Sequence, residues 1–174
     1  NSEWSKAKHS ALRLLAGGGQ RLGPLTGYAA AIEITLDAGF KTYWRDPGDS
    51  GVPPTFDWSA SDNVDRVEVV WPAPFLFPDA GSFSIGYKDK LLLPLAVTAK
   101  DAAKPVTLRL KLDYAVCDKQ CIPEHAQAAL TLPQSGESPH LMRIGEAFER
   151  APKRVNLNDM QYGIGLRAVS HRTE

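Results

Sequence analysis

The sequence lacks a long hydrophobic run, and it has only two cysteines in 174 residues. Its longest apolar run, residues 91–97, is interrupted by Pro94. A helix that spans a bilayer takes about 20 apolar residues, so we expect no direct insertion of this chain into a membrane. No signal peptide is visible at Asn1, but a mature or trimmed product would show none, and export therefore stays open.

The chain also lacks net charge, because 20 Lys and Arg residues balance 20 Asp and Glu residues. A neutral chain produces no general field that would attract nucleic acid or an anionic membrane. No P-loop, no Gly-x-Gly-x-x-Gly motif and no basic stripe is present. We therefore expect no nucleic-acid partner, no nucleotide and no organic cofactor.

Helical periodicity is absent from most of the chain, and 13 Pro and 14 Gly separate short apolar runs. This pattern is typical of short strands joined by turns. The segments 45–54 and 72–82, rich in Pro and Gly, are predicted loops, and Pro94 predicts an edge strand or a bulge. The spacing of about eight strands favours an all-β fold, an antiparallel sandwich or barrel. The predicted strands are 9–15, 28–36, 40–44, 64–71, 83–87, 90–98, 106–116 and 127–132.

One short helix is predicted near the C-terminus, over residues 138–150. Ser138 is the expected N-cap and Pro139 the first helical residue, and one face is apolar, formed by Leu141, Ile144, Ala147 and Phe148. The strand at 28–36 is expected to be half-buried, with Glu33 on the face opposite Ile32 and Ile34. We expect one domain over residues 1–135 and a helix with an extension over 136–174. The extension is a tail, a further strand or the start of a second domain that this sequence lacks.

The two cysteines, Cys117 and Cys121, follow the strand with the clearest alternation. In a straight strand their Cα atoms would be about 13 Å apart, whereas a disulfide needs about 4.4–6.8 Å. Either the cysteines are not bonded, or the chain turns at residues 118–120, where three polar residues suit a hairpin. Nearby charges could tune the thiols or transfer protons, although they could also be solvated surface charges. These charged or titratable residues are Asp113, Asp118, Lys119, Glu124 and His125.

Three chemical roles stay open for the pair. A five-residue ring stabilises a domain by only about 2 kcal/mol, and a small ring at an exposed loop is easy to reduce, which favours redox exchange over a structural bridge. We expect no metal: Cys117, Cys121 and His125 have metal-ligand spacing, but closed zinc sites need four ligands. Two thiolates could nevertheless hold Cu(I), and the only methionines, Met142 and Met160, are distant in sequence.

Several motifs carry a resemblance to a known family. They are Phe40-Lys-Thr-Tyr-Trp-Arg-Asp-Pro-Gly-Asp-Ser-Gly-Val-Pro-Pro54, Phe56-Asp-Trp-Ser59, Trp71-Pro-Ala-Pro74, Gly86-Tyr87 with Leu93-Pro94, and Leu112 to Cys117 with Cys121-Ile-Pro123. Over residues 9–133 the chain resembles the periplasmic amino-terminal domain of DsbD-type thiol:disulfide interchange proteins, closest to the suppressor-of-copper-sensitivity B branch. The spacing of three residues between the cysteines is shorter than in the best-known members.

The resemblance implies an immunoglobulin-like sandwich in the bacterial periplasm, either a fragment of a membrane protein or a stand-alone relative. It implies a cysteine pair that takes electrons from a membrane-embedded donor domain, in the same or another chain, and reduces thioredoxin-fold proteins. By position, Cys121 attacks the partner and Cys117 resolves the mixed disulfide. It also implies an aromatic cap over the pair, for which the chain offers Phe75, Phe77 and Phe83.

Overall fold

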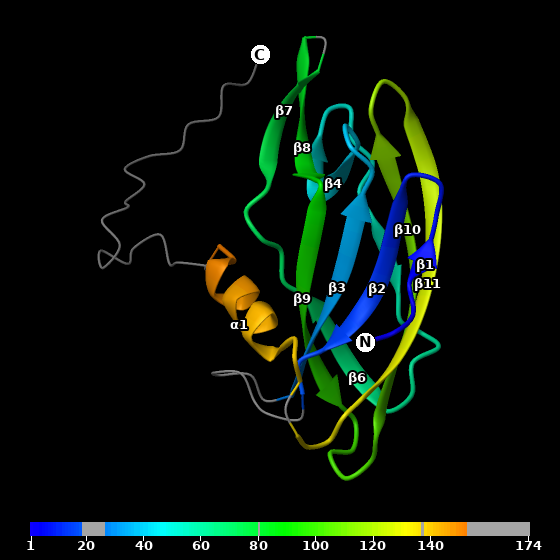
Figure 1. Ribbon diagram of the computed structural model, residues 1–174, viewed down its shortest axis with the longest axis vertical. Coiled ribbons are helices and arrows are strands. Elements are labelled where there is room, and N and C mark those ends of the chain that lie inside the picture. The colour runs from blue at the N-terminus through cyan, green and yellow to red at the C-terminus, as the bar shows by residue number, and fades with distance from the viewer. Residues whose placement is uncertain (19–26, 80, 137, 153–174) are drawn as a thin grey trace, which may run out of the picture.

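The computed structural model describes residues 1–18, 27–79, 81–136 and 138–152, which form two antiparallel sheets packed face to face (Figure 1). Sheet A has the order β1-β2-β3-β9-β6, with the strands Ser5–Lys6, Ser10–Ala16, Tyr28–Leu36, Lys90–Ala99 and Val64–Val69. Sheet B has the order β11-β10-β4-β8-β7, with the strands Cys121–Leu132, Val106–Cys117, Lys41–Gly48, Ser82–Lys88 and Phe75–Asp79, and β5 (Thr55–Asp57) also pairs with β10.

The core lies between the sheets because alternate side chains of each strand point inward. In β10, Leu108, Leu110 and Leu112 are at most 1% exposed, whereas Arg109 and Lys111 face solvent. Inward residues of β2, β3 and β9 pack against them from sheet A. The predicted fold class, an immunoglobulin-like antiparallel sandwich with one short helix, is confirmed.

Three predictions about proline-containing segments were wrong. The expected loop at 45–54 begins later, because β4 continues to Gly48, which pairs with Ser84 of β8. The expected loop at 72–82 contains β7, an edge strand that pairs with β8 and tolerates Pro78 because one side of an edge strand has no partner. Pro94 lies in β9, a strand between β3 and β6. The carbonyl of Pro94 accepts a hydrogen bond from Val70 N–H at 2.8 Å, just past the end of β6. In an antiparallel strand the N–H and C=O of one residue point to the same side, so the N–H that proline lacks would also face β6. Pro94 therefore removes no hydrogen bond between β9 and β3.

The helix α1 spans Leu141–Arg150 and covers the outer face of sheet A, beside β9 and β3 (Figure 1). It begins later than predicted, with His140 and not Ser138 at the N-cap. Ser138 lies before the helix, where its Oγ donates to Ala16 O at 2.5 Å and accepts from His140 N–H at 3.1 Å. Ile144 is fully buried against Leu15, Ala29 and Ala31. The helix thus packs on the sandwich itself.

The helix also buries Glu33, so the expectation of a half-buried β3 was wrong. Glu33 is 6% exposed, and its carboxylate accepts hydrogen bonds from Arg13 and Arg143, with ion-pair distances of 2.6 Å to both. Burial by itself raises the pKa of Glu33, but the bonds and charges of Arg143 and Arg13 outweigh it and bring the pKa below its ordinary value. A helix 110 residues away in the chain therefore determines the environment of this strand.

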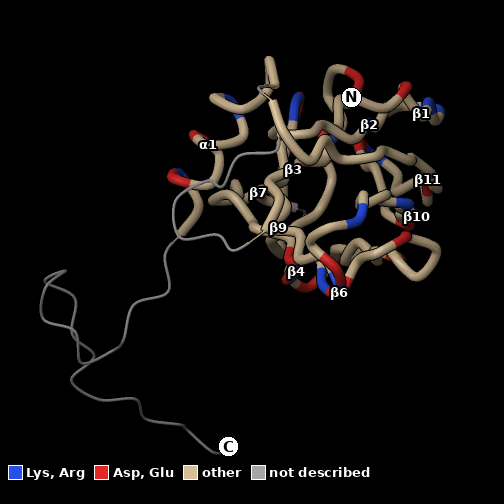
Figure 2. The backbone as a smooth tube through the Cα atoms, turned by 90° about the horizontal axis from the view of Figure 1, so that it is seen from below, with Lys and Arg blue, Asp and Glu red and all other residues tan. Residues whose placement is uncertain are grey.

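Basic and acidic residues are interspersed along the described part of the chain in the view of Figure 2. Within the described part of the chain, no helix has both the length and the apolar character needed to cross a membrane.

Candidate functional site

The cysteine pair lies at the tip of the β10–β11 hairpin. Cys117 ends β10 and Cys121 begins β11, where the two residues are direct cross-strand partners and form a disulfide with a Cα–Cα distance of 4.2 Å. The turn between them is held by Asp118, whose Oδ1 accepts the N–H groups of Lys119 and Gln120. These bonds lower the pKa of Asp118. The predicted reversal of the chain at residues 118–120 is confirmed.

The two cysteines differ in exposure. Cys117 is 2% exposed, because β4 pairs with β10 here and places Lys41 opposite it. The side chain of Thr42 in β4 donates to Ala115 O at 2.9 Å and fixes this pairing. Cys121 begins the edge strand β11 and is exposed. Of the two cysteines, Cys121 is the one on the surface, and it lines a groove.

Tyr43 is the side chain that contacts both sulfurs. It is 3% exposed, and its hydroxyl lies 3.0 Å from Cys117 Sγ and 3.2 Å from Cys121 Sγ. Bonded sulfurs carry no hydrogen, so the tyrosine hydroxyl donates. Gly51 closes over the ring: a β-carbon there would lie 2.8 Å from Tyr43 Cδ1 and 2.3 Å from Pro47 Cβ. Sequence analysis missed this role, although Tyr43 belongs to the motif at 40–54.

The predicted tuning residues do not contact the sulfurs. Asp113 and His125 are cross-strand partners whose exposed side chains are joined by a hydrogen bond of 2.5 Å between His125 Nδ1 and Asp113 Oδ1. They share the outer face of the hairpin with the cysteines. His125 is four positions along the strand from Cys121, so their Cα atoms are about 13 Å apart. Lys119 is exposed in the turn.

Glu124 lies on the opposite, inner face of the hairpin and is 4% exposed. Its carboxylate accepts from His9 N–H at 2.9 Å and from the Ser10 hydroxyl, and Ser10 Oγ lies 2.6 Å from the hydroxyl of Tyr114. Ser10 donates its single hydroxyl hydrogen to Glu124, so the hydroxyl of Tyr114 donates to Ser10. Burial raises the pKa of Tyr114 to about 12. This network ties β2 in sheet A to the hairpin.

Two of the three predicted cap residues share the face of the disulfide. Phe75 and Phe77 lie in β7 with ring centroids 6.4 Å apart. The ammonium group of Lys41, the cross-strand partner of Cys117, lies 5.3 Å from the Phe77 ring centroid. Phe83 falls on the other face by strand alternation, since it precedes Ser84, the partner of Phe77. The strands β4 and β8 separate β7 from β10, which places it about 14 Å away.

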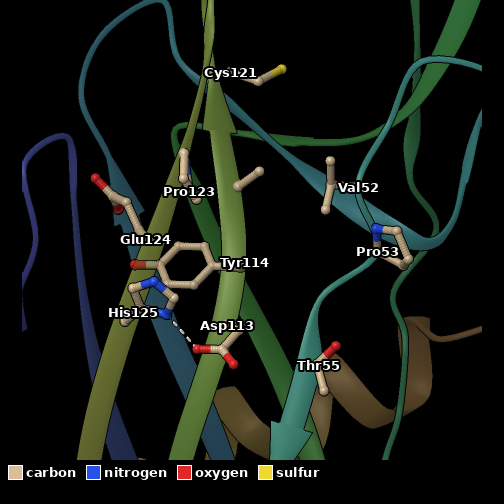
Figure 3. A pocket seen from close by; sticks show the side chains of 10 residues that line it. Val52, Pro53, Thr55, Asp113, Tyr114, Cys121, Pro123, Glu124 and His125 are labelled. Atoms are coloured by element: carbon tan, nitrogen blue, oxygen red, sulfur yellow. Dashed lines mark hydrogen bonds and ion pairs between the residues drawn. The ribbon is translucent and has the colours of Figure 1, made fainter.

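A groove of about 360 Å³ runs along the outer face of the hairpin from Cys121 (Figure 3). One side is the segment after β4, and the floor and other side are β10 and β11. Its lining residues are Val52, Pro53, Thr55, Asp113, Tyr114, Ala115, Cys121, Pro123, Glu124 and His125.

The described residues contain no group of three or more His, Cys, Asp and Glu side chains placed to hold a metal ion. Cys117, Cys121 and His125 have metal-ligand spacing in the sequence, but the imidazole of His125 does not reach the sulfurs. His125 instead pairs with Asp113, farther along the hairpin.

Comparison with known proteins gives two findings. Residues 22–133 match the family model described as the N-terminal part of the thiol:disulfide interchange protein DsbD. The crystal structure of the N-terminal periplasmic domain of ScsB from Proteus mirabilis is similar, with a TM-score of 0.68 and 26% sequence identity over 88% of this chain. The match spans 60% of that ScsB chain. Comparison with curated proteins gave no match.

Proposed function

Because the chain belongs to the family of N-terminal domains of the thiol:disulfide interchange protein DsbD, we propose that it is a periplasmic thiol–disulfide exchange domain. It takes electrons from a membrane-embedded donor domain and passes them to oxidised proteins of the thioredoxin fold through Cys117 and Cys121. The family description supports the exchange chemistry, and the periplasmic origin of the similar ScsB domain supports the compartment.

The observation that carries the assignment of roles is the contrast between exposed Cys121 and buried Cys117. In the dithiol state, the Cys121 thiolate attacks one sulfur of the partner disulfide, and the other partner sulfur leaves as a thiolate and takes up a proton. Cys117 then attacks Cys121 Sγ, re-forms the internal disulfide and releases the second partner thiol. Two electrons pass to the partner, and a donor dithiol attacking Cys121 restores the starting state.

Tyr43 supports this chemistry by donating to sulfur. A hydrogen bond to a thiolate is stronger than one to a neutral sulfur, so the phenol favours the charged form that the resolving step needs. Because Cys117 is buried, its thiolate is kept from the disulfides of other proteins, and the sulfur that it can attack is Cys121 Sγ.

Single cysteine variants test the proposal. We expect Cys121→Ser to abolish reduction of an oxidised thioredoxin-fold protein, and Cys117→Ser to accumulate a mixed disulfide with it, visible by mass spectrometry and lost on addition of reductant. If both variants reduce the partner at the parent rate, the proposal is wrong. A reduction potential of the pair below about −300 mV would instead favour a structural disulfide.

A further inference from the structure

The groove beside Cys121 originates in the pairing of β10. On one side β10 pairs with β5 at residues 111–113 and with β4 at 116–117, so residues 114 and 115 lie between the two pairings. The connecting segment contains Pro53 and Pro54, which have no N–H to donate to a ladder. Ala115 forms the floor of the groove, and its small side chain makes the groove deeper there. The result is an apolar channel between Val52 and Pro53 on one side and Pro123 on the other (Figure 3).

The exchange reaction itself restricts what can lie in this channel. In a mixed disulfide, the Cα atom of the partner cysteine lies about 5.5–6 Å from Cα of Cys121. The neighbouring residues of the partner must therefore pass over the surface around Cys121. The side toward Cys117 is covered by β4 and Tyr43, whereas the groove is open and has Cys121 in its wall. The partner chain thus has an open course along the groove.

An extended partner segment places its side chains at fixed intervals. Side chains two residues apart point to the same side and are separated by about 6.6–6.8 Å. The same spacing separates Cys121 from Pro123 on β11, and Pro123 lines the groove opposite Val52. If the partner cysteine points at Cys121, the residue two positions away points at the apolar middle of the groove.

Resting on the proposed function, we propose that this groove is a docking subsite for an extended segment of the redox partner, with an apolar side chain two residues from the reactive cysteine. The chemistry of the middle of the groove selects such a side chain, because Val52, Pro53, Ala115 and Pro123 offer no charged group. Val52 is 49% exposed, an apolar surface that such a residue would cover. The hydrogen-bonded side chains of Asp113 and His125 end the groove.

Three short disulfides test the subsite with the reduced chain. They are the pentapeptides Leu-Gly-Cys-Gly-Leu and Gly-Leu-Cys-Leu-Gly and the single residue N-acetylcysteine amide, each carrying 5-thio-2-nitrobenzoate on its sulfur. Cys121 attacks the cysteine sulfur and the thionitrobenzoate anion leaves, and Cys117 then releases the peptide thiol, so two electrons leave the chain for each peptide. We expect the first peptide to react at least about fivefold faster than its isomer of equal composition.

Val52→Asp is expected to abolish that preference, which is measured as the ratio of the two pentapeptide rates so that any effect of the new charge on the Cys121 thiolate cancels. The matched control is Met142→Asp, a 78% exposed apolar residue on α1, which should keep the preference. Equal rates for the two pentapeptides would overturn the subsite and leave the proposed function standing. An undiminished preference in Val52→Asp would also overturn it, because the apolar side chain of the peptide would then not contact Val52. A reduced chain that reacts with none of the three would contradict the proposed function as well.

Discussion

The outer faces of the two sheets differ, although the strands of both alternate in the same way. On sheet A, α1 buries Ile144 against three apolar residues and Arg143 joins Arg13 on Glu33. On the cysteine end of sheet B no described helix covers the strands, and Cys121 remains exposed beside an open groove.

This contrast shows that the outward residues of a strand acquire their role from what covers them. A carboxylate that would be solvated on an open face becomes a buried ionic group beneath α1, where it must be paired. A disulfide on the uncovered face stays within reach of another protein. Stability and exchange are therefore expected to respond to substitutions on different sheets.

The largest expected effect is on stability and comes from the covered face. Ile144→Ala removes a fully buried side chain from between α1 and sheet A, and we expect a loss of about 3 kcal/mol in the free energy of unfolding. The exchange rate, measured where the variant is fully folded, should stay at the parent value. Chemical denaturation checks the first expectation and a thiol-exchange assay the second. An equal loss of exchange in folded protein would show that the two faces are not independent.

A smaller effect with a defined pH dependence is expected from Glu33→Gln, which leaves Arg13 and Arg143 without their carboxylate. We expect a loss of about 2 kcal/mol near neutral pH, because a buried charge-assisted network is broken. The native pKa of Glu33 lies below its ordinary value of 4.5. Its ionised form therefore stabilises the fold fully above about pH 4.5, and this contribution disappears as the pH falls through the native pKa.

Denaturation of parent and Glu33→Gln protein over pH 2–7 measures this dependence. The two free-energy curves should be separated at neutral pH and converge in acid. Parallel curves over the whole range would mean that Glu33 titrates alike in the folded and unfolded chain.

On the open face, Tyr43→Phe should change redox behaviour more than stability. The ring remains in place under Gly51, and only the hydroxyl next to the two sulfurs is lost. Because that hydroxyl favours the thiolate over the disulfide, its loss should make the reduction potential more negative by roughly 30 mV, equivalent to about 1.4 kcal/mol. Equilibration with a glutathione or dithiothreitol redox buffer measures the shift. An unchanged potential would assign Tyr43 a packing role only.

The smallest effect is expected from His125→Ala. The side chain of His125 is 76% exposed and its partner Asp113 is also exposed, and a polar contact between two exposed side chains contributes little to the free energy of unfolding. Unfolding free energy should change by less than about 0.5 kcal/mol, and exchange with the N-acetylcysteine derivative by less than twofold. A large change in that exchange rate would mean that His125 reaches the sulfurs despite the strand distance.

Much of the fold could be predicted from alternation and turns. The strand at 28–36 and the turn at 118–120 were located correctly, because each depends on local residues. The strand β7 was missed because its Pro78 resembles loop composition, and only pairing with β8 makes it an edge strand. The cysteines were found by their spacing, whereas Tyr43 was missed because its hydroxyl reaches them only after β4 pairs with β10.

The sequence by itself determined the all-β class and the presence of one amphipathic helix, since these follow from periodicity within short segments. It offered the turn between Cys117 and Cys121 as one of two alternatives, because three polar residues suit a hairpin. The tertiary structure decided which sulfur is exposed, which side chain contacts both, and which sheet the helix covers. These depend on contacts between residues far apart in the chain, such as Tyr43 with Cys117 and Glu33 with Arg143, and no local pattern specifies such contacts.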